Sequence, residues 1–339
     1  MPFLLTTPEF KDVLSPAEMV EATENAYREW ALGTAYNQPR RTLQAGLARL
    51  RTHAGAVLSL NVMGVRVHAP VNNVLDIPPG LKTQIVLLWN HKTLGLEAIL
   101  AGEAYQLHFP AGTSAVAAKY LSRKDARSVG IFGASGLAKD HILSLMVVRN
   151  ITSVKIYSRN KERRTAFATE MQRVTGIEVL PVDSPKDVLL GTEIVVTATD
   201  SDVPVFDGNW IQEGTHISTS VAENLGEAEA RNLVSKPREI DDRTVERSHQ
   251  IFTNSKEQIT VDQQGSILEP MKRGIIGWED VHDLSEIFTG RFPGRTNDSE
   301  ITLFLHSGGQ GVADIAVAYK IYEKAKKMGR GAEIPDLPA

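Results

Sequence analysis

A run of small residues near the middle of the chain has the composition of a phosphate-binding turn. It reads Gly133-Ala134-Ser135-Gly136-Leu137-Ala138 and lies between an apolar stretch, Val129–Phe132, and a helical pattern that runs from Leu137 to about Val148. Backbone N–H groups at such a helix start can face a pyrophosphate, and small side chains let it approach closely. The turn approximates the dinucleotide fingerprint G-x-G-x-x-G/A, with serine in the second glycine position and alanine in the third. An ordinary tight turn is the alternative.

The end of the next predicted strand, Val154–Tyr157, bears on the choice between NAD and NADP. In a dinucleotide-binding unit an acidic residue there accepts a hydrogen bond from the ribose of NAD, whereas arginine accommodates the extra phosphate of NADP. No Asp or Glu occupies positions 158–160, and the stretch supplies Ser158, Arg159, Asn160 and Arg163. The sequence therefore favours NADP(H) over NAD(H), unless these basic residues belong to a solvated helix start.

A further candidate for the cofactor site is Thr197-Ala198-Thr199, which ends a predicted parallel strand. A dinucleotide lies at that carboxyl edge of such a sheet, although a β-rich strand end has the same composition. Other chemistries lack support. Histidine and acidic residues occur without metal-ligand spacing, so no metal site is expected, and no G-x-S-x-G motif indicates a hydrolase nucleophile.

Length and composition limit the class of protein. The 339 residues exceed the usual size of one domain, and 42% hydrophobic with 23% charged residues is typical of a globular protein. A net charge of −4 gives no electrostatic footprint for nucleic acid. The absence of cysteine excludes disulfides and thiolate chemistry and is compatible with a cytoplasmic location. We expect no membrane span and no signal peptide.

The amino-terminal third predicts a sheet with one buried face. Ser15 caps a first helix, with Pro16 at its first position and Glu18 completing a capping box, and Gly33 ends it. Short alternating segments separated by turn signals then indicate largely antiparallel strands. The predicted strands are Ala56–Val62, Val65–His68, Ile85–Trp89 and Leu96–Leu100. A small-residue helix, Ser114–Leu121, follows.

From residue 121 onward, strand and helix alternate, which predicts a doubly wound parallel sheet. The predicted strands are 129–132, 154–157, 177–181, 193–199, 215–218 and 238–241, and the helices are 137–148, 161–174 and 185–190. A last amphipathic helix, 312–327, is expected to return to the first domain. The expected fold class is α/β, with a Rossmann-type parallel sheet in 121–304. A mixed, largely antiparallel sheet domain for substrate binding and dimerisation is expected in 1–120, joined by 305–339.

The order of these pieces resembles the ornithine cyclodeaminase/mu-crystallin family over nearly the whole chain. The stretches that carry the resemblance are Ser114–Leu121, Arg123–Ala134, Val196–Thr199, Trp210–Ile217, Gly294-Arg295 and Glu300–Phe304. The resemblance implies a homodimer built through the sheet domain, with the nicotinamide between the two domains. Members of the family reduce imines or keto acids, oxidise amino acids or cyclise ornithine, and the mu-crystallin branch binds NADP and thyroid hormone.

The resemblance also implies site residues, and several of them depart from the family pattern. The first carboxylate-binding arginine falls in a Pro-x-Arg context, which Arg41 fits. The position of the catalytic lysine holds Arg66, and that of the second substrate arginine holds Phe109. The acidic residue of the family falls on Glu223. The substrate-binding candidates are therefore Arg41, Arg66 and Phe109, with core packing as the alternative for Phe109.

Hydride transfer to an imine or carbonyl needs an oriented nicotinamide, a grip on the substrate charge, and a proton donor or acceptor. Arginine grips carboxylates through two hydrogen bonds but cannot act as a base at neutral pH. Arg66 and Arg41 could clamp a carboxylate, and proton transfer would fall to Glu223 or to a histidine, His68 or His108. The catalytic candidates are therefore Arg66, Glu223 and His108. A strand histidine bonded to the backbone is the alternative for His68 and a solvated loop carboxylate for Glu223.

The expected function is an NAD(P)H-dependent oxidoreductase, with NADP(H) favoured, that reduces an imine or keto group of a small imino, keto or amino acid. The leading alternative is a dimeric NADP-dependent ligand-binding protein that has lost catalysis. An amino-acid cyclodeaminase is less favoured, because the lysine and the second arginine are missing. We expect a homodimer and no nucleic-acid or membrane partner.

Overall fold

The computed structural model describes residues 1–10, 12–46, 48–69, 84–102, 108–220 and 238–335. The chain divides into two compact units, Met1–Phe109 with Gly309–Ala339, and Pro110–Gly308. Both ends of the chain therefore contribute to the first unit.

The division differs from the predicted boundaries, after residues 120 and 304, mainly at helix α3 (His108–Leu121). Ala118 of α3 belongs to a hydrophobic core of the second unit. Arg149 Nη2 donates to the Ala118 carbonyl oxygen at 2.9 Å, and Thr302 Oγ1 donates to that of Leu121 at 2.8 Å. These contacts make α3 part of the second unit rather than the first.

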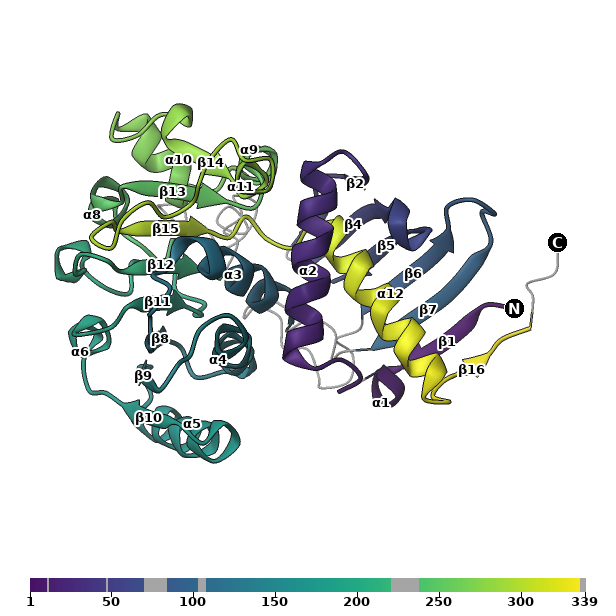
Figure 1. Ribbon diagram of the computed structural model, residues 1–339, viewed down its shortest axis with the longest axis horizontal. Helices are drawn as coiled ribbons and strands as arrows, with labels where there is room; N and C mark the ends of the chain where they lie inside the picture. Colours follow the sequence, from purple (N-terminus) through teal and green to yellow (C-terminus); the bar gives the residue numbers. More distant parts are fainter. Residues whose placement is uncertain (11, 47, 70–83, 103–107, 221–237, 336–339) are drawn as a thin grey trace. The chain divides into compact units, whose positions relative to one another are not determined.

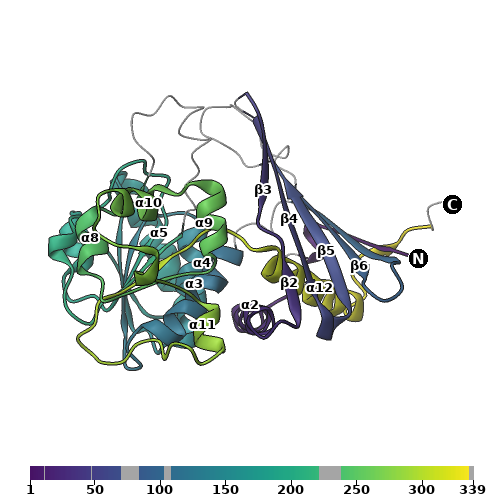
Figure 2. The same cartoon turned by 90° about the horizontal axis from the view of Figure 1, so that it is seen from above.

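The first unit contains a mixed sheet with strand order β16-β1-β7-β6-β5-β4-β2, and β3 pairs with β4. Only β1 and β7 pair in parallel, so the predicted mixed and largely antiparallel sheet is confirmed. Helices α2 and α12 lie on one side of the sheet (Figure 2). The elements are β1 (Phe3–Thr6), α1 (Thr7–Phe10), α2 (Pro16–Ala31), β2 (Ala35–Asn37), β3 (Arg41–Ala45), β4 (Ala48–Val57), η1 (Leu58–Leu60), β5 (Val62–His68), β6 (Gln84–Asn90), β7 (Leu96–Gly102), α12 (Gly311–Lys327) and β16 (Ala332–Glu333).

Helix α2 begins as its sequence predicts. The Ser15 hydroxyl accepts from the Glu18 backbone N–H at 3.3 Å, and the Glu18 carboxylate accepts from the Ser15 N–H at 2.8 Å. With Pro16 at the first helical position, this capping box satisfies N–H groups that would otherwise lack partners.

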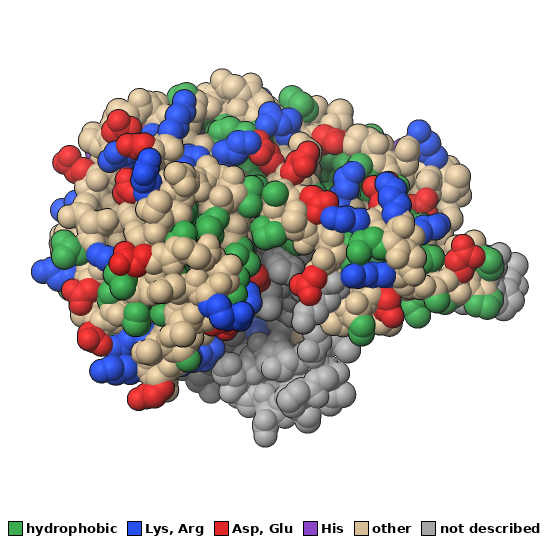
Figure 3. Space-filling model, turned by 60° about the horizontal axis from the view of Figure 1, so that its bottom comes forward, with side chains coloured by type: hydrophobic (Ala, Val, Ile, Leu, Met, Phe, Trp, Pro, Cys, Tyr) green, Lys and Arg blue, Asp and Glu red, His purple; other side chains and the backbone are tan. Residues whose placement is uncertain are grey.

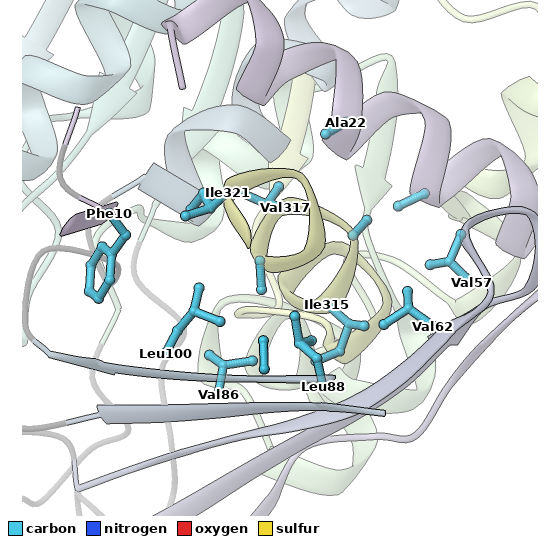
Figure 4. Close-up of a cluster of buried hydrophobic side chains, with 14 of the residues drawn as sticks. Phe10, Ala22, Val57, Val62, Val86, Leu88, Leu100, Ile315, Val317 and Ile321 are labelled. Carbon is cyan, nitrogen blue, oxygen red and sulfur yellow. The ribbon is translucent and has the colours of Figure 1, made fainter. Parts of the chain in front are cut away.

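The core of the first unit lies between α12 and the sheet (Figure 4). Ile315 from α12 packs toward Val62 and Leu88 from the strands, and fully burying each such side chain contributes about 1.5–3 kcal/mol. Helix and sheet approach closely because glycines line the contact. A Cβ on Gly55 of β4 would lie 2.5 Å from the Gly311 carbonyl carbon, so no larger residue fits there.

One predicted strand of this unit, Ala56–Val62, is wrong. Strand β4 ends at Val57, the 3₁₀ turn η1 follows, and β5 starts at Val62. Asn61 adopts a left-handed conformation with φ +54°, which asparagine tolerates better than most residues, and its N–H donates to Leu58 O at 3.0 Å. The alternation of apolar residues continues through this turn, which hides it from the sequence pattern.

The second unit is a doubly wound, fully parallel sheet with strand order β10-β9-β8-β11-β12-β15-β13-β14 (Figure 1). The predicted Rossmann-type sheet is thus confirmed. Its elements after α3 are β8 (Ser128–Phe132), α4 (Gly136–Val148), β9 (Ser153–Tyr157), α5 (Lys161–Thr175), β10 (Glu178–Pro181), α6 (Pro185–Leu189), β11 (Ile194–Thr197), η2 (Gly208–Trp210), β12 (His216–Thr219), α8 (Asp242–Arg247), β13 (Gln250–Thr253), α9 (Lys256–Asp262), α10 (Gly265–Lys272), η3 (Trp278–Asp280), β14 (Val281–Asp283), α11 (Ser285–Phe288) and β15 (Thr302–Leu305).

The predicted strand Arg238–Asp241 is wrong. Asp241 instead caps α8, because its carboxylate accepts from the Thr244 N–H at 2.8 Å. The last three strands of the sheet, β13, β14 and β15, lie further along the chain, and the sequence analysis predicted none of them.

The described residues form no continuous basic area on the face displayed in Figure 3. Lys and Arg side chains are interspersed with Asp and Glu side chains on the face displayed in Figure 3. No described helix combines the length and the apolar composition that crossing a membrane requires.

Candidate active site

The small-residue turn of the second unit joins β8 to α4, and its backbone conformation requires glycine. Gly133 has φ +115°, a value that residues with a side chain rarely adopt. A Cβ at this position would lie 2.2 Å from the carbonyl oxygen of Ala198. The turn is thus packed directly against the loop that follows β11, which brings two of the predicted cofactor-binding stretches together.

The amino terminus of α4 leaves its first N–H groups available for an anion. Ser135 occupies the N-cap position, but its side chain makes no capping hydrogen bond. The N-cap residues of α5, α6, α8 and α9 differ, since Asn160, Ser184, Asp241 and Ser255 all cap through their side chains, whereas Gln264 of α10, like Ser135, does not. An uncapped, small-residue helix start is the arrangement that fits a pyrophosphate, whose charge the helix dipole also favours. Gly136 and Leu137 form the first turn of this helix.

The segment after β9 lies beside this turn. The Asn160 side chain caps α5 by accepting from the Arg163 N–H at 2.7 Å, and the Ser158 hydroxyl donates to the Asn160 carbonyl at 3.1 Å. Arg163 Nε donates to the Ala134 carbonyl at 2.9 Å, which ties the two segments together. Arg159 is exposed. The structure therefore brings the predicted residues 158–163 next to 133–134, with Arg159 facing solvent.

A carboxylate that the sequence analysis missed orders the loop after β11. The buried Glu239 accepts hydrogen bonds from Thr197 Oγ1 at 2.8 Å, Thr199 N at 2.9 Å and Thr199 Oγ1 at 2.6 Å. Ala198 N donates to Phe132 O at 2.8 Å. Glu239 lies in the stretch that was predicted as a strand, and only its position before the α8 cap could have indicated a loop. It holds Thr197–Thr199 at the carboxyl edge of the sheet.

The inner face of the first sheet, on the side of α12, changes from apolar to polar along its strands. Alternate side chains of β4, β5 and β6 point to this face, and cross-strand pairs join His53 to Arg66, and His68 to both Arg51 and Gln84. The apolar part lies beneath α12, and the polar part adjoins the first turn of that helix, where Asp314 lies. The inward-facing polar side chains on these strands are Arg49, Arg51, His53, Arg66, His68 and Gln84.

Arg66 takes part in a buried ion pair. Its Nη1 donates to Asp314 Oδ2 at 3.1 Å and its Nε to Gln84 Oε1 at 2.9 Å. Burial alone would raise the pKa of Asp314, but the Arg66 charge and the contact with His53 outweigh that effect and lower it. Asp314 is therefore ionised at neutral pH, and Arg66 is fixed from two sides on the polar half of the face.

The predicted carboxylate-binding residue Arg41 lies on the other face of the sheet. It pairs with Thr52, which alternates with His53 and so points outward, and its side chain is exposed. Its neighbour Arg40 is buried instead. Burial is the largest cause of the lowered pKa of His53, and the charges of Arg66 and Arg40 lower that pKa further. The role of Arg41 stays a prediction. The buried neighbour Arg40 is the residue that we consider for the inner face, because a shift of one position moves a side chain to the opposite face of a strand.

Two buried histidines complete the polar half. His53 Nε2 lies 3.1 Å from His68 Nε2, and His53 Nδ1 lies 3.0 Å from Asp314 Oδ2. Burial lowers the pKa of His53 to about 4 and, together with the charge of Arg66, holds the pKa of His68 far below its usual range. The sequence analysis weighed His68 but missed His53, because it predicted no strand over residues 48–55.

Comparison with known proteins decides the family. The model of the ornithine cyclodeaminase/mu-crystallin family matches residues 3–329. The chain belongs to this family. It is 29% identical over 276 residues to a Δ1-pyrroline-2-carboxylate reductase from Bacillus cereus, and the match covers 81% of each chain.

Two solved structures resemble this chain over nearly its whole length. The Δ1-pyrroline-2-carboxylate reductase of Thermococcus litoralis, in complex with NADH and L-proline, has a TM-score of 0.86 and 30% identity, covering 98% of this chain and 100% of that chain. An archaeal alanine dehydrogenase dimer with bound NAD has a TM-score of 0.85 and 26% identity, covering 99% of each chain. The expected family, fold class and oxidoreductase activity with a nicotinamide cofactor are thereby confirmed.

Some residues predicted from the family pattern have no described side chain. Glu223 lies outside the described residues. His108 and Phe109 begin α3, but only their backbone is described. Their assignments stay predictions. Among the described residues, no group of three or more His, Cys, Asp or Glu side chains is placed to hold a metal ion.

Proposed function

We propose that this chain is an NADPH-dependent reductase of small imino acids, acting on a C=N bond next to a carboxylate. The observation that carries the proposal is the buried polar half of the first sheet, where Arg40 and Arg66 supply positive charge beside two histidines that can transfer a proton. Two arginines suit a carboxylate, since guanidinium and carboxylate geometries match. The likeness to reductases of a cyclic imino acid supports the same substrate class.

In this proposal the second unit binds the cofactor and the first unit binds the substrate. Gly133, the uncapped start of α4 and the Thr197–Thr199 loop bind the cofactor, which supplies a hydride when reduced. Arg40 and Arg66 bind and orient the substrate carboxylate, and Gln84 and Asp314 keep the Arg66 guanidinium in place. Arginine replaces the family's lysine at position 66, so the group that transfers the proton must be another residue. Glu223 and His108 remain predictions for that role.

The test is reduction by the purified protein of Δ1-pyrroline-2-carboxylate, iminosuccinate, pyruvate with ammonia, and related imino acids, followed by the loss of NADPH absorbance. Turnover of at least one cyclic or acyclic imino acid is expected. Binding of NADPH without turnover of any of them would favour the ligand-binding protein instead, and turnover of ornithine to proline would favour a cyclodeaminase.

The preference for NADPH depends on Arg159, the exposed cation after β9. Replacing Arg159 with alanine should weaken NADPH binding by about 10-fold to 100-fold and change NADH binding by less than about 2-fold, because only NADPH carries the additional phosphate. Isothermal titration calorimetry with each cofactor measures both affinities.

The matched control is Arg173→Ala, which removes one exposed positive charge from the last turn of α5, the helix that follows Arg159. It should leave both affinities unchanged. Equal weakening of NADH and NADPH by Arg159→Ala would contradict the assignment of Arg159 to the phosphate, and tighter binding of NADH by the wild type would contradict the preference itself.

We also propose a homodimer formed through the outer face of the first sheet. No α-helix of the described residues covers this face (Figure 2), and apolar side chains occupy it in cross-strand pairs. Ile85 is 42% exposed there and pairs with Val67, while Val65 pairs with Leu87. A bare apolar sheet face indicates a partner surface. The solved archaeal alanine dehydrogenase is a dimer.

Ile85→Asp should therefore convert the dimer to a monomer in sedimentation velocity experiments, because it buries a charge in the proposed interface. Thr93→Asp, on the exposed turn between β6 and β7, introduces the same charge away from the interface and should keep the dimer. A wild-type monomer, or a dimer that persists in Ile85→Asp, would contradict this interface.

A further inference from the structure

A continuous row of polar groups runs from α12 into the polar half of the first sheet: Asp314, His53 and His68. The Asp314 Oδ2 to His53 Nδ1 distance is 3.0 Å, and the His53 Nε2 to His68 Nε2 distance is 3.1 Å. Exposed fractions are 0% for Asp314, 3% for His53 and 6% for His68. Because each contact joins one group to the next, a change of protonation at one end can be transmitted to the other.

The charge of Asp314 indicates where the ring protons lie. Asp314 Oδ2 is at ion-pair distance from His53 Nδ1, although the two atoms are not aligned as a hydrogen bond. An ionised carboxylate attracts a proton on the nitrogen that faces it, so we assign the His53 proton to Nδ1, and His53 then faces His68 with an unprotonated Nε2. His68 must then donate from Nε2, which leaves its Nδ1 as a bare acceptor. That atom is buried and has no hydrogen-bond partner within the described ranges. His53 Nδ1 and His91 Nε2 also lack a hydrogen-bond partner within the described ranges, so a missing partner alone does not mark a site. His68 Nδ1 differs from them because it ends the row beside the charges of Arg66, Arg51 and Arg40, where a bound carboxylate would be attracted.

We propose that His68 exchanges the proton with the substrate nitrogen, and that His53 and Asp314 position His68 and take up the charge it gains. This inference rests on the proposed imino-acid reductase function and names the group that replaces the missing lysine. His68 would be the catalytic residue, and His53 and Asp314 are positioning residues that act through it.

The chemistry balances with the reduced nicotinamide cofactor as the hydride source and one proton that the histidine pair takes up from water. In the reducing direction the histidine pair starts with one extra proton, so that His53 carries two ring protons and His68 carries one, on Nδ1. The imine carbon accepts the hydride, the C=N π electrons move to nitrogen, and that nitrogen takes the His68 Nδ1 proton. The Nε2 proton of His53 moves to His68 Nε2, and both rings end neutral. In the oxidising direction the same transfers reverse, and the positive charge formed lies on His53 beside Asp314.

The surrounding charges explain how the binding of a substrate carboxylate could favour the extra proton on the His53–His68 pair. Arg66 from β5, Arg51 from β4 and Arg40 before β3 all disfavour a charged His68, whereas Asp314 from α12 favours a charged His53. From β6 the facing side chain is the neutral Gln84. A substrate carboxylate that offsets the arginine charges would favour uptake of the extra proton, so binding and protonation would be coupled.

The experiment compares His68→Gln with the wild type in steady-state reduction of Δ1-pyrroline-2-carboxylate by NADPH. We expect kcat to fall by about 100-fold to 10,000-fold, the usual contribution of general acid catalysis, with an unchanged dissociation constant for NADPH. His91→Gln, in the turn after β6, removes a histidine of the same unit outside this row and should retain wild-type kcat.

Two readouts separate proton transfer from a structural role. The wild-type kcat should decline as pH rises through the pKa of the histidine pair in the complex, and His68→Gln should lose that decline. Added imidazole should restore part of the kcat of His68→Ala. Wild-type turnover with an unchanged kcat in His68→Gln, or a slow His68→Ala that imidazole does not rescue, would overturn the role of His68 alone. A wild type that binds NADPH but reduces no imino acid would overturn the proposed function and this inference together.

Discussion

Replacing Gly133 with valine should weaken the binding of NADPH and NADH by about 100-fold or more, which corresponds to about 2.8 kcal/mol. The backbone at this position has φ +115°, and a Cβ would lie 2.2 Å from the Ala198 carbonyl oxygen. The β8–α4 turn and the loop after β11 cannot keep their contact around a side chain, so the α4 N–H groups would lose the position in which we propose that they bind the pyrophosphate. Calorimetric titration with each cofactor measures the loss.

A second glycine separates this clash from simple backbone strain. Gly191 also has positive φ, +67°, but no atom lies within 4 Å of a Cβ placed there. Gly191→Val should therefore lower stability by about 1 kcal/mol or more through strain and keep the cofactor affinity of the wild type. Retained cofactor binding in a folded Gly133→Val protein would show that the pyrophosphate does not occupy this turn.

Replacing Asp314 with asparagine should lower the free energy of unfolding by about 3–5 kcal/mol, the usual cost of removing one partner from a buried ion pair. Asp314 is fully buried and contacts both Arg66 and His53, so it links α12 to β4 and β5. The substitution removes the negative charge that faces Arg66 and His53, while the positive charge of Arg66 stays buried. Urea denaturation, monitored by circular dichroism, measures the change.

The lowered pKa of Asp314 determines how its contribution to the free energy of unfolding changes with pH. The folded pKa of Asp314 is lowered, so its stabilising contribution is present above the unfolded pKa, about 3.9, and is lost as pH falls through the folded pKa. The stability difference between wild type and Asp314→Asn should therefore be full at pH 7 and should narrow below about pH 4. Asp125→Asn, which removes the exposed partner of Arg123, should leave the urea midpoint unchanged. A full-sized difference that persists at pH 3 would contradict the assigned ionisation of Asp314.

Local sequence signals predict more of the second unit, to which we assign the cofactor, than of the first unit, to which we assign the substrate. Strand β8, helix α4 and strand β9 follow from local signals: a short apolar run, a small-residue turn and helical periodicity. Because the turn and the helix start that we assign to the pyrophosphate are contiguous in the chain, one stretch of sequence contains most of the proposed cofactor site. Glu239 is the exception, since it reaches Thr197 and Thr199 from 42 and 40 residues away.

In the first unit, the side chains that reach the polar part of the inner sheet face are set by strand register and by partners far away in the sequence. Whether Arg40 or Arg41 faces inward is set by the pairing of Arg41 with Thr52, and a reading of the Pro-x-Arg pattern alone cannot resolve a shift by one position. His53 acquires its role only when β4 pairs with β5 and α12 brings Asp314, which is 261 residues away, onto the same face. Such contacts leave no periodic signal in the sequence.

The most direct test of the account is the reduction of Δ1-pyrroline-2-carboxylate by the purified wild-type protein, with NADPH consumption and product formation followed together. An imino-acid reductase forms one equivalent of L-proline per NADPH oxidised, or the corresponding amino acid from another imino acid that the protein prefers, and we expect this result. A protein that fails to bind either nicotinamide cofactor in calorimetry, or that binds one and reduces no imino acid, would contradict it.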